Sequence, residues 1–166
     1  MTPSPATVNI ALRPIEATDE PFLYTLYAST RQSELDLVDW TDAAKAAFLR
    51  QQFAAQHTYY QAHYLGAAFE LILLDRHPIG RLYVARWPDQ IRVVDIALLP
   101  EYRGSGIGTY LLRALQRESS ATDKPLTIHV ERFNPALALY TRLGFTQKED
   151  RGVYLLLEWS QLKIAS

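Results

Sequence analysis

Hydrophobic residues in the early part of the chain recur three and four positions apart. After a strand expected over Val8 to Arg13, this spacing runs from residue 18 or 19 to about 29, and again from 41 to about 62. Side chains at this spacing share one face of a helix, so the pattern predicts two helices. Gly66 ends the second helical pattern, and the hydrophobic period changes after it.

Three strands follow, with short polar turns between them, at Phe69–Leu74, Ile79–Val84 and Ile91–Leu99. Short turns between consecutive strands predict an antiparallel meander. In the third strand, simple alternation predicts two opposite faces, one with Val94, Ile96 and Leu98 and the other with Val93, Asp95 and Ala97. Because both faces are almost wholly apolar, we expect this strand in the middle of the sheet.

The rest of the chain predicts a helix after a glycine-rich turn, a strand, a short helix and two last strands. Asn134 and Pro135 suit the start of the short helix, and Gly144 suits its C-terminal cap. The three strands are expected at Pro125–Val130, Phe145–Lys148 and Val153–Trp159. The predicted order of elements is therefore β-α-α-β-β-β-α-β-α-β-β.

Length and composition narrow the class of protein. A chain of 166 residues suits one domain, 1–166, and we expect residues 1–6 and 161–166 to be flexible. A net charge of −1 argues against a nucleic-acid binder, and the lack of cysteine excludes disulfides and thiolate chemistry. We see no membrane-spanning apolar run and no export signal, so we expect a cytoplasmic protein that binds neither membrane nor nucleic acid.

Three of the seven glycines lie together, at Gly104, Gly106 and Gly108, between a strand and a helix. The first N–H groups of a helix lack intrahelical partners and favour an anion such as a pyrophosphate. An ordinary glycine-rich turn fits the same residues. A P-loop is disfavoured, because Thr109 and Tyr110 stand where that motif needs Lys and then Ser or Thr. A Rossmann site is disfavoured because antiparallel strands precede the turn.

Two motifs resemble those of the GNAT superfamily of acyl-CoA-dependent N-acetyltransferases. The pattern R/Q-x-x-G-x-G/A is met by Arg103, Gly106 and Gly108. An asparagine followed by a short helix ending in Y-x-x-L-G-F is met by Asn134 and the segment Tyr140–Phe145. The order of elements is similar to that family over essentially the whole chain. The resemblance implies an α+β fold with a mixed, mostly antiparallel sheet flanked by helices, and acetyl-CoA as acyl donor without a metal.

The resemblance also implies which residues contact acetyl-CoA. The turn would hold the pyrophosphate with its amides, and the free edge of the preceding strand would bind the pantetheine arm as an added strand does. An N–H of that edge would polarise the thioester carbonyl. The expected contacts are Ile96, Ala97, Leu98, Arg103, Gly104, Ser105, Gly106, Ile107, Gly108, Thr109 and Asn134.

Tyr140 is the residue that the resemblance assigns to catalysis. Its phenol would protonate the departing CoA thiolate as a general acid, whereas its spacing alone fits a core tyrosine. The general base stays open among Asp95, His129, Glu131 and ordered water. For Asp95 we favour a structural role, for instance as the ion-pair partner of an arginine.

The acceptor site is expected between about Leu35 and Tyr64, where aromatic and polar residues are mixed. This segment fits either a pocket wall for a flat or amphipathic amine or a helix that packs an aromatic stripe on the sheet. We expect a small molecule with a primary amine as acceptor, and a homodimer is left open. The alternative is a protein of the same fold that binds acyl-CoA and transfers nothing. The presence of Tyr140 favours the enzyme.

Overall fold

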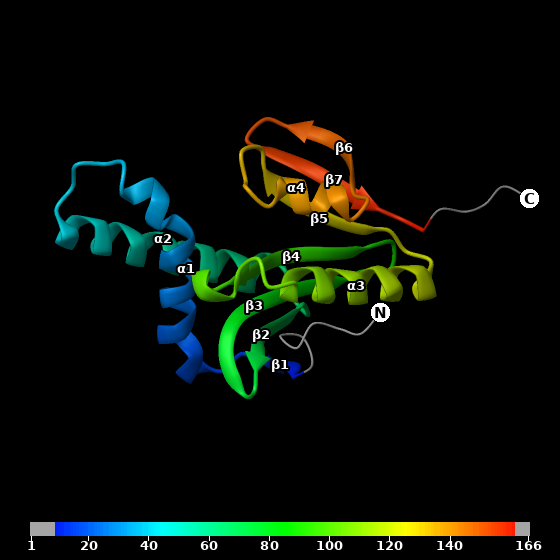
Figure 1. The fold of residues 1–166 in the computed structure, drawn as a ribbon, viewed down its shortest axis with the longest axis horizontal. Helices are drawn as coiled ribbons and strands as arrows, with labels where there is room; N and C mark the ends of the chain where they lie inside the picture. Colours follow the sequence, from blue (N-terminus) through cyan, green and yellow to red (C-terminus); the bar gives the residue numbers. More distant parts are fainter. Residues whose placement is uncertain (1–8, 162–166) are drawn as a thin grey trace, which may run out of the picture.

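The computed structural model describes residues 9–161, which form one seven-stranded sheet with helices on both faces (Figure 1). The expected flexibility of residues 1–6 and 161–166 concerns segments that, apart from residue 161, lie outside the described residues. The strands are β1 (Ile10–Pro14), β2 (Ala68–Leu74), β3 (His77–Arg86), β4 (Ile91–Leu98), β5 (Leu126–Glu131), β6 (Thr146–Arg151) and β7 (Tyr154–Trp159). The α-helices are α1 (Glu20–Leu35), α2 (Asp42–His63), α3 (Ile107–Thr122) and α4 (Leu137–Arg142).

The observed order of strands and α-helices confirms the predicted order. The largest difference in bounds is at α1, which was expected to end near residue 29 and continues to Leu35. The residues after 29 are mostly polar, which is typical of a loop. Leu35 is nevertheless buried in this segment against α2, and this holds the last turns of the helix in place. Arg31 and Glu34, three residues apart, form an ion pair that supports the added turns.

The sheet has the order β1-β2-β3-β4-β5-β7-β6, and all neighbours are antiparallel except β4 and β5. The parallel pairing is short: Ile91–Val93 pairs with Leu126–Ile128 and pairing stops there. Beyond this point the two strands diverge, as the ribbon shows (Figure 1). The edge of β4 that faces β5 is therefore free from residue 94 onward, at the centre of the molecule.

A β-bulge corrects the predicted faces of β4. Tyr83 pairs with Asp95 but Val84 pairs with Val93, so Val94 has no partner on β3. The extra residue reverses the alternation. As a result Val93 contributes to the same core as Ile96, whereas simple alternation placed these two residues on opposite faces.

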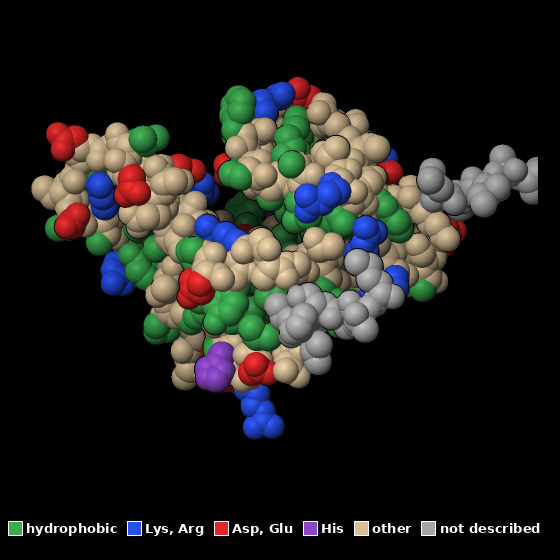
Figure 2. Space-filling view, viewed as in Figure 1, with side chains coloured by type: hydrophobic (Ala, Val, Ile, Leu, Met, Phe, Trp, Pro, Cys, Tyr) green, Lys and Arg blue, Asp and Glu red, His purple; other side chains and the backbone are tan. Residues whose placement is uncertain are grey.

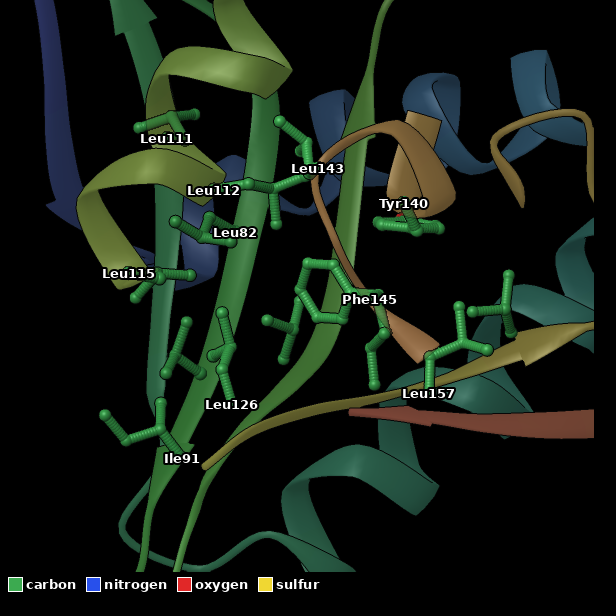
Figure 3. Packing of buried hydrophobic residues seen from close by; sticks show 14 of the residues in the cluster. Leu82, Ile91, Leu111, Leu112, Leu115, Leu126, Tyr140, Leu143, Phe145 and Leu157 are labelled. Carbon is green, nitrogen blue, oxygen red and sulfur yellow. The ribbon is translucent and has the colours of Figure 1, made fainter. Parts of the chain in front are cut away.

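The two faces of the sheet carry different cores. Helices α3 and α4 cover one face, where Leu82, Ile91 and Leu126 pack with Leu112 of α3 and Phe145 after α4 (Figure 3). Helices α1 and α2 cover the other face over the first strands, around a smaller cluster that includes Leu23, Phe53 and Leu71. The divergence of β4 and β5 thus opens between two helical layers.

Candidate functional site

The glycine-rich turn before α3 leaves its amides unpaired. Gly104 and Gly106 have φ of +72° and +89°, a conformation that glycine adopts without the steric cost of a side chain. Gly106 is the N-cap of α3, and no side chain caps this helix. Within the described residues, the backbone N–H groups of residues 104–109 donate no hydrogen bond, and the first amide that does so is Tyr110, to Gly106. These amides are available to an anion.

The side chain of Arg103 ties this turn to the end of β4. Its Nε donates to the carbonyl oxygen of Leu98 at 3.1 Å, and its Nη2 donates to the hydroxyl of Ser29 on α1 at 3.3 Å. The hydroxyl of Ser105 donates to the carbonyl oxygen of Tyr102 at 2.6 Å. The two polar side chains of the turn therefore fix its backbone, and its amide groups remain free for a ligand.

The free edge of β4 lies beside this turn. Residues 95–98, which include Ile96, Ala97 and Leu98, pair with β3 on one side and with no strand on the other. Gly80 of β3 allows this part of β4 to lie close, because a Cβ atom there would be 2.3 Å from the carbonyl oxygen of Ala97. The predicted cofactor contacts on β4 and in the turn are thus brought together at one opening.

Helix α4 starts later than predicted, and this corrects the expected cap. The N-cap is Ala136, not Asn134. The Asn134 side chain accepts a hydrogen bond from the N–H of Ala136 at 2.8 Å, which forms a turn before the helix. The C-terminal prediction is confirmed: Gly144 has φ of +94°, and the N–H of Phe145 donates to the carbonyl oxygen of Tyr140.

Tyr140 lies on the inner side of α4, only 4% exposed, with its ring 5.7 Å from that of Phe145 (Figure 3). Its hydroxyl has no hydrogen-bond partner among residues 9–161. The fully buried side-chain atoms without a partner there are Arg81 Nε and the Tyr83 hydroxyl, so the Tyr140 hydroxyl keeps some exposure. Burial, and then the negative charge of Asp95, raise the pKa of Tyr140. The phenol therefore stays protonated at neutral pH.

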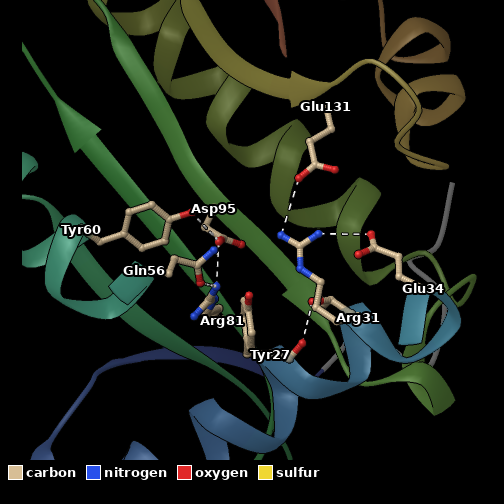
Figure 4. A network of polar contacts seen from close by, with 9 residues as sticks. Tyr27, Arg31, Glu34, Gln56, Tyr60, Arg81, Asp95 and Glu131 are labelled. Atoms are coloured by element: carbon tan, nitrogen blue, oxygen red, sulfur yellow. Dashed lines mark hydrogen bonds and ion pairs between the residues drawn. The ribbon is translucent and has the colours of Figure 1, made fainter. Parts of the chain in front are cut away.

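Asp95 is held in a polar network on the α2 side of the sheet (Figure 4). Its carboxylate accepts from Arg81 Nη2 at 2.7 Å and from the Tyr60 hydroxyl at 2.9 Å. The same Arg81 nitrogen donates to Gln56 Oε1 at 2.8 Å. The expected ion pair of Asp95 with an arginine is confirmed, and it makes Asp95 a poor candidate for the general base.

A second set of charges joins α1 to the end of β5. Arg31 lies 3.6 Å from Glu131 and 3.2 Å from Glu34 (Figure 4). Burial disfavours the guanidinium, but contacts with Tyr27 and these two carboxylates raise the pKa of Arg31 overall. Figure 2 shows the surface hollowed between the part formed by α1 and α2 and the part formed by α4 and the last strands. Arg31 and Glu131 connect these two parts.

His129 projects from β5 onto the face that carries Asp95 and lies between two arginines. Its Nδ1 is 3.1 Å from Nη1 of Arg92, and its Nε2 is 2.9 Å from Nη1 of Arg151. Burial, followed by the charges of Arg92 and Arg151, lowers the pKa of His129. The imidazole is therefore neutral at pH 7.

Within the described part of the chain, no three His, Asp or Glu side chains converge as metal ligands. No helix there has the length and apolar character needed to cross a bilayer. Of the predicted site residues, the structure brings the turn, the β4 edge and α4 together around one opening. A Cβ atom placed on Gly108 of α3 would lie 4.0 Å from Cδ2 of Leu139, so α3 and α4 lie close together beside Tyr140.

Comparison with known proteins assigns this chain to a family. A protein-family model described as an acetyltransferase (GNAT) domain matches residues 65–147, half of the chain. The chain therefore belongs to the GNAT acetyltransferase family, as its motifs suggested. An N-alpha-acetyltransferase of Saccharolobus solfataricus is 32% identical over 106 residues, a match that covers 54% of this chain and 63% of that relative.

Two solved structures have the same fold at low sequence identity. The PaiA N-acetyltransferase from Thermoplasma acidophilum, in complex with coenzyme A, has a TM-score of 0.69 and is 17% identical, covering 92% of this chain and 99% of that one. A GNAT family acetyltransferase from Elizabethkingia anophelis, with acetyl-CoA bound, has a TM-score of 0.58 and is 18% identical, covering 93% and 99% of the two chains.

Proposed function

We propose that this protein transfers the acetyl group of acetyl-CoA to a primary amine of a small acceptor. The observation that carries the proposal is the row of unpaired amides at residues 104–109, beside the free edge of β4 and the phenol of Tyr140. The coenzyme A and acetyl-CoA complexes of similar folds support the same ligand here. The turn would bind the pyrophosphate, residues 96–98 the pantetheine arm, and Asn134 its far side.

The roles in the transfer follow from this placement. The amine nitrogen forms a bond to the thioester carbonyl carbon, and an N–H of the β4 edge stabilises the charge on the carbonyl oxygen. The carbon–sulfur bond then breaks, and the Tyr140 hydroxyl gives its proton to the leaving thiolate. The nitrogen loses its surplus proton to water. The raised pKa means that the phenol still holds its proton when the thiolate forms.

Replacement of the phenol hydroxyl tests this assignment. We expect Tyr140→Phe to lower kcat about tenfold or more, since general acid catalysis contributes at least that much, and to leave acetyl-CoA affinity nearly unchanged. Release of CoA thiol with a panel of amines gives kcat, and calorimetry gives the affinity. Tyr24→Phe is the matched control, because this tyrosine of α1 packs against Phe53 of α2, within the other core.

The outcomes separate the proposal from its alternative. An unchanged kcat for Tyr140→Phe would remove this residue from the mechanism. Tight binding of acetyl-CoA by a wild-type protein that acetylates no amine would favour the alternative, a protein that binds acyl-CoA without transferring the acyl group.

A further inference from the structure

Arg92 of β4 is a buried cation without a carboxylate partner. Only 8% of this residue is exposed, and the three side chains within hydrogen-bond distance of its guanidinium are neutral. These partners are Thr127 Oγ1 at 2.8 Å, His129 Nδ1 at 3.1 Å and Gln90 Oε1 at 3.2 Å. None of the described Asp and Glu residues forms an ion pair with it. A buried charge is costly unless an opposite charge compensates it, and here the charge of Asp89 acts on the guanidinium only from beyond ion-pair distance, so a bound anion would be stabilised.

His129 adds a second unbalanced contact at the same place. A neutral imidazole has one N–H group and one lone pair, yet both of its ring nitrogens face guanidinium donors. Only one of the two contacts can be a hydrogen bond. Arg151, the outer of the two arginines, is half exposed and paired with Glu149 at 2.7 Å. An anion bound beside the two arginines would accept hydrogen bonds from both and from the N–H of the imidazole.

This basic cluster, Arg92, His129 and Arg151, is connected to the Asp95 network by a row of aromatic rings. Tyr60, which donates to Asp95, has its ring 6.1 Å from that of Tyr64. Tyr64 stacks on Trp87 at 6.1 Å, and the guanidinium of Arg92 lies 5.3 Å from the Trp87 ring. The three half-buried rings form an aromatic wall between Asp95 and the guanidinium of Arg92.

The bulge at Val94 places Arg92 and Asp95, at the two ends of this wall, on one face of the sheet. Arg92 pairs with Ala85 and Asp95 pairs with Tyr83, so the two side chains lie on the same face of the sheet. The partners on β3 are two residues apart, which separates the two positions by about 7 Å along the strand. An amine held beside the free edge of β4 could therefore extend a short apolar chain to the basic cluster.

We infer that the acceptor carries an anionic group, a carboxylate or a phosphate, which binds to the basic cluster while the amine reacts beside β4. This inference rests on the proposed acetyl transfer and adds the chemical class of the acceptor. The aromatic wall contacts the apolar part of the acceptor. The cluster thereby selects amines that bear an acidic group a short chain away over amines that lack one.

Three amines of equal chain length test the inference: 6-aminohexanoate, its neutral analogue 6-aminohexanamide, and hexylamine. Initial rates of CoA thiol release at low amine concentration give kcat/KM for each. We expect kcat/KM for 6-aminohexanoate to exceed that for 6-aminohexanamide by about tenfold or more, because hydrogen bonds to charged groups are among the stronger ones. The same comparison with 6-aminohexyl phosphate asks whether phosphate replaces carboxylate.

Two variants assign the preference to the cluster. Arg151→Gln should bring the ratio of the two kcat/KM values close to one, and because this side chain is half exposed the fold should persist. Arg92→Lys keeps the charge but loses the planar donor pair, so it should also reduce the ratio. Arg117→Gln, an exposed arginine on α3 across the sheet, is the matched control and should keep the wild-type ratio. If Arg92→Lys does not fold, Arg151→Gln decides.

Binding provides a readout that does not depend on acetyl transfer. In the wild-type protein without acetyl-CoA, 6-aminohexanoate should shift the NMR signals of the His129 ring, and in Arg151→Gln it should not. Equal kcat/KM for the acid and the amide would overturn the inference and leave the proposed function standing. If no amine is acetylated, the proposed function fails, and the His129 signals decide: a shift supports the anion site, and unmoved signals exclude it.

Discussion

Removal of one partner of the buried ion pair between Arg81 and Asp95 should lower the free energy of unfolding several times more than removal of one partner of a surface pair of the same length. Its side chains are 4% and 16% exposed, and the nitrogen–oxygen distance is 2.7 Å. Removal of one partner leaves the other charge buried, which costs about 3–5 kcal/mol in comparable cases. Asp95 keeps some contact with water, so we expect about 3 kcal/mol for Asp95→Asn and a similar loss for Arg81→Met.

The pair Arg86–Glu118 is the control, because its distance is 2.6 Å but its side chains are 44% and 34% exposed. There we expect less than about 1 kcal/mol for Glu118→Gln. Urea denaturation of Glu118→Gln, Arg81→Met, Asp95→Asn and the double variant Arg81→Met with Asp95→Asn gives these losses, and the last three with the wild type complete a double-mutant cycle. The double variant should be clearly more stable than the sum of the single losses predicts. Strictly additive losses, or equal losses at the buried and the exposed pair, would refute this reasoning.

Three further predictions concern stability and the opening. The pKa of His129 is lowered in the folded state, so the unfolded state binds protons first as pH falls below about 6.5. The free energy of unfolding should therefore drop from pH 7 to 5 more in the wild type than in His129→Gln. Parallel pH curves for the two proteins would contradict this. Gly80→Ala should destabilise by about 1–3 kcal/mol and weaken acetyl-CoA binding, since the new methyl would overlap the carbonyl of Ala97; wild-type calorimetry for this variant would argue against the close approach. Thr41 accepts from the N–H of Ala44 at 3.1 Å as N-cap of α2, so Thr41→Ala should cost about 1 kcal/mol in urea denaturation, and no loss would mean that the cap is not formed in solution.

Local patterns predicted most of the elements of this fold. The glycine turn and the capped end of α4 depend on residues within a few positions of one another, and the structure has both. The bulge could not be read from the sequence, because Val93 and Val94 are equally apolar and give no sign of which face each one takes. The length of α1 was underestimated because Leu35, the only large apolar residue in its last turns before Asp36, is buried by contacts distant in the chain.

For the charged residues of the site, the sequence predicted the type of partner but not its position in the chain. An arginine partner for Asp95 was expected, but its identity as Arg81 follows from the register of β3 against β4. The contact of Arg92 with His129 joins residues 37 positions apart, and no local pattern in the sequence predicts it. Asn134 was expected to cap α4, but its side chain accepts the N–H of Ala136 in a turn that precedes the helix.

The amide signals of Gly104, Gly106 and Gly108 in an NMR titration with acetyl-CoA test the central claim most directly, because we propose that the backbone of this turn binds the pyrophosphate. We expect large shifts of these three signals, together with those of the free edge of β4, and small shifts on β1 and β2. Unmoved glycine signals at saturating acetyl-CoA would contradict it.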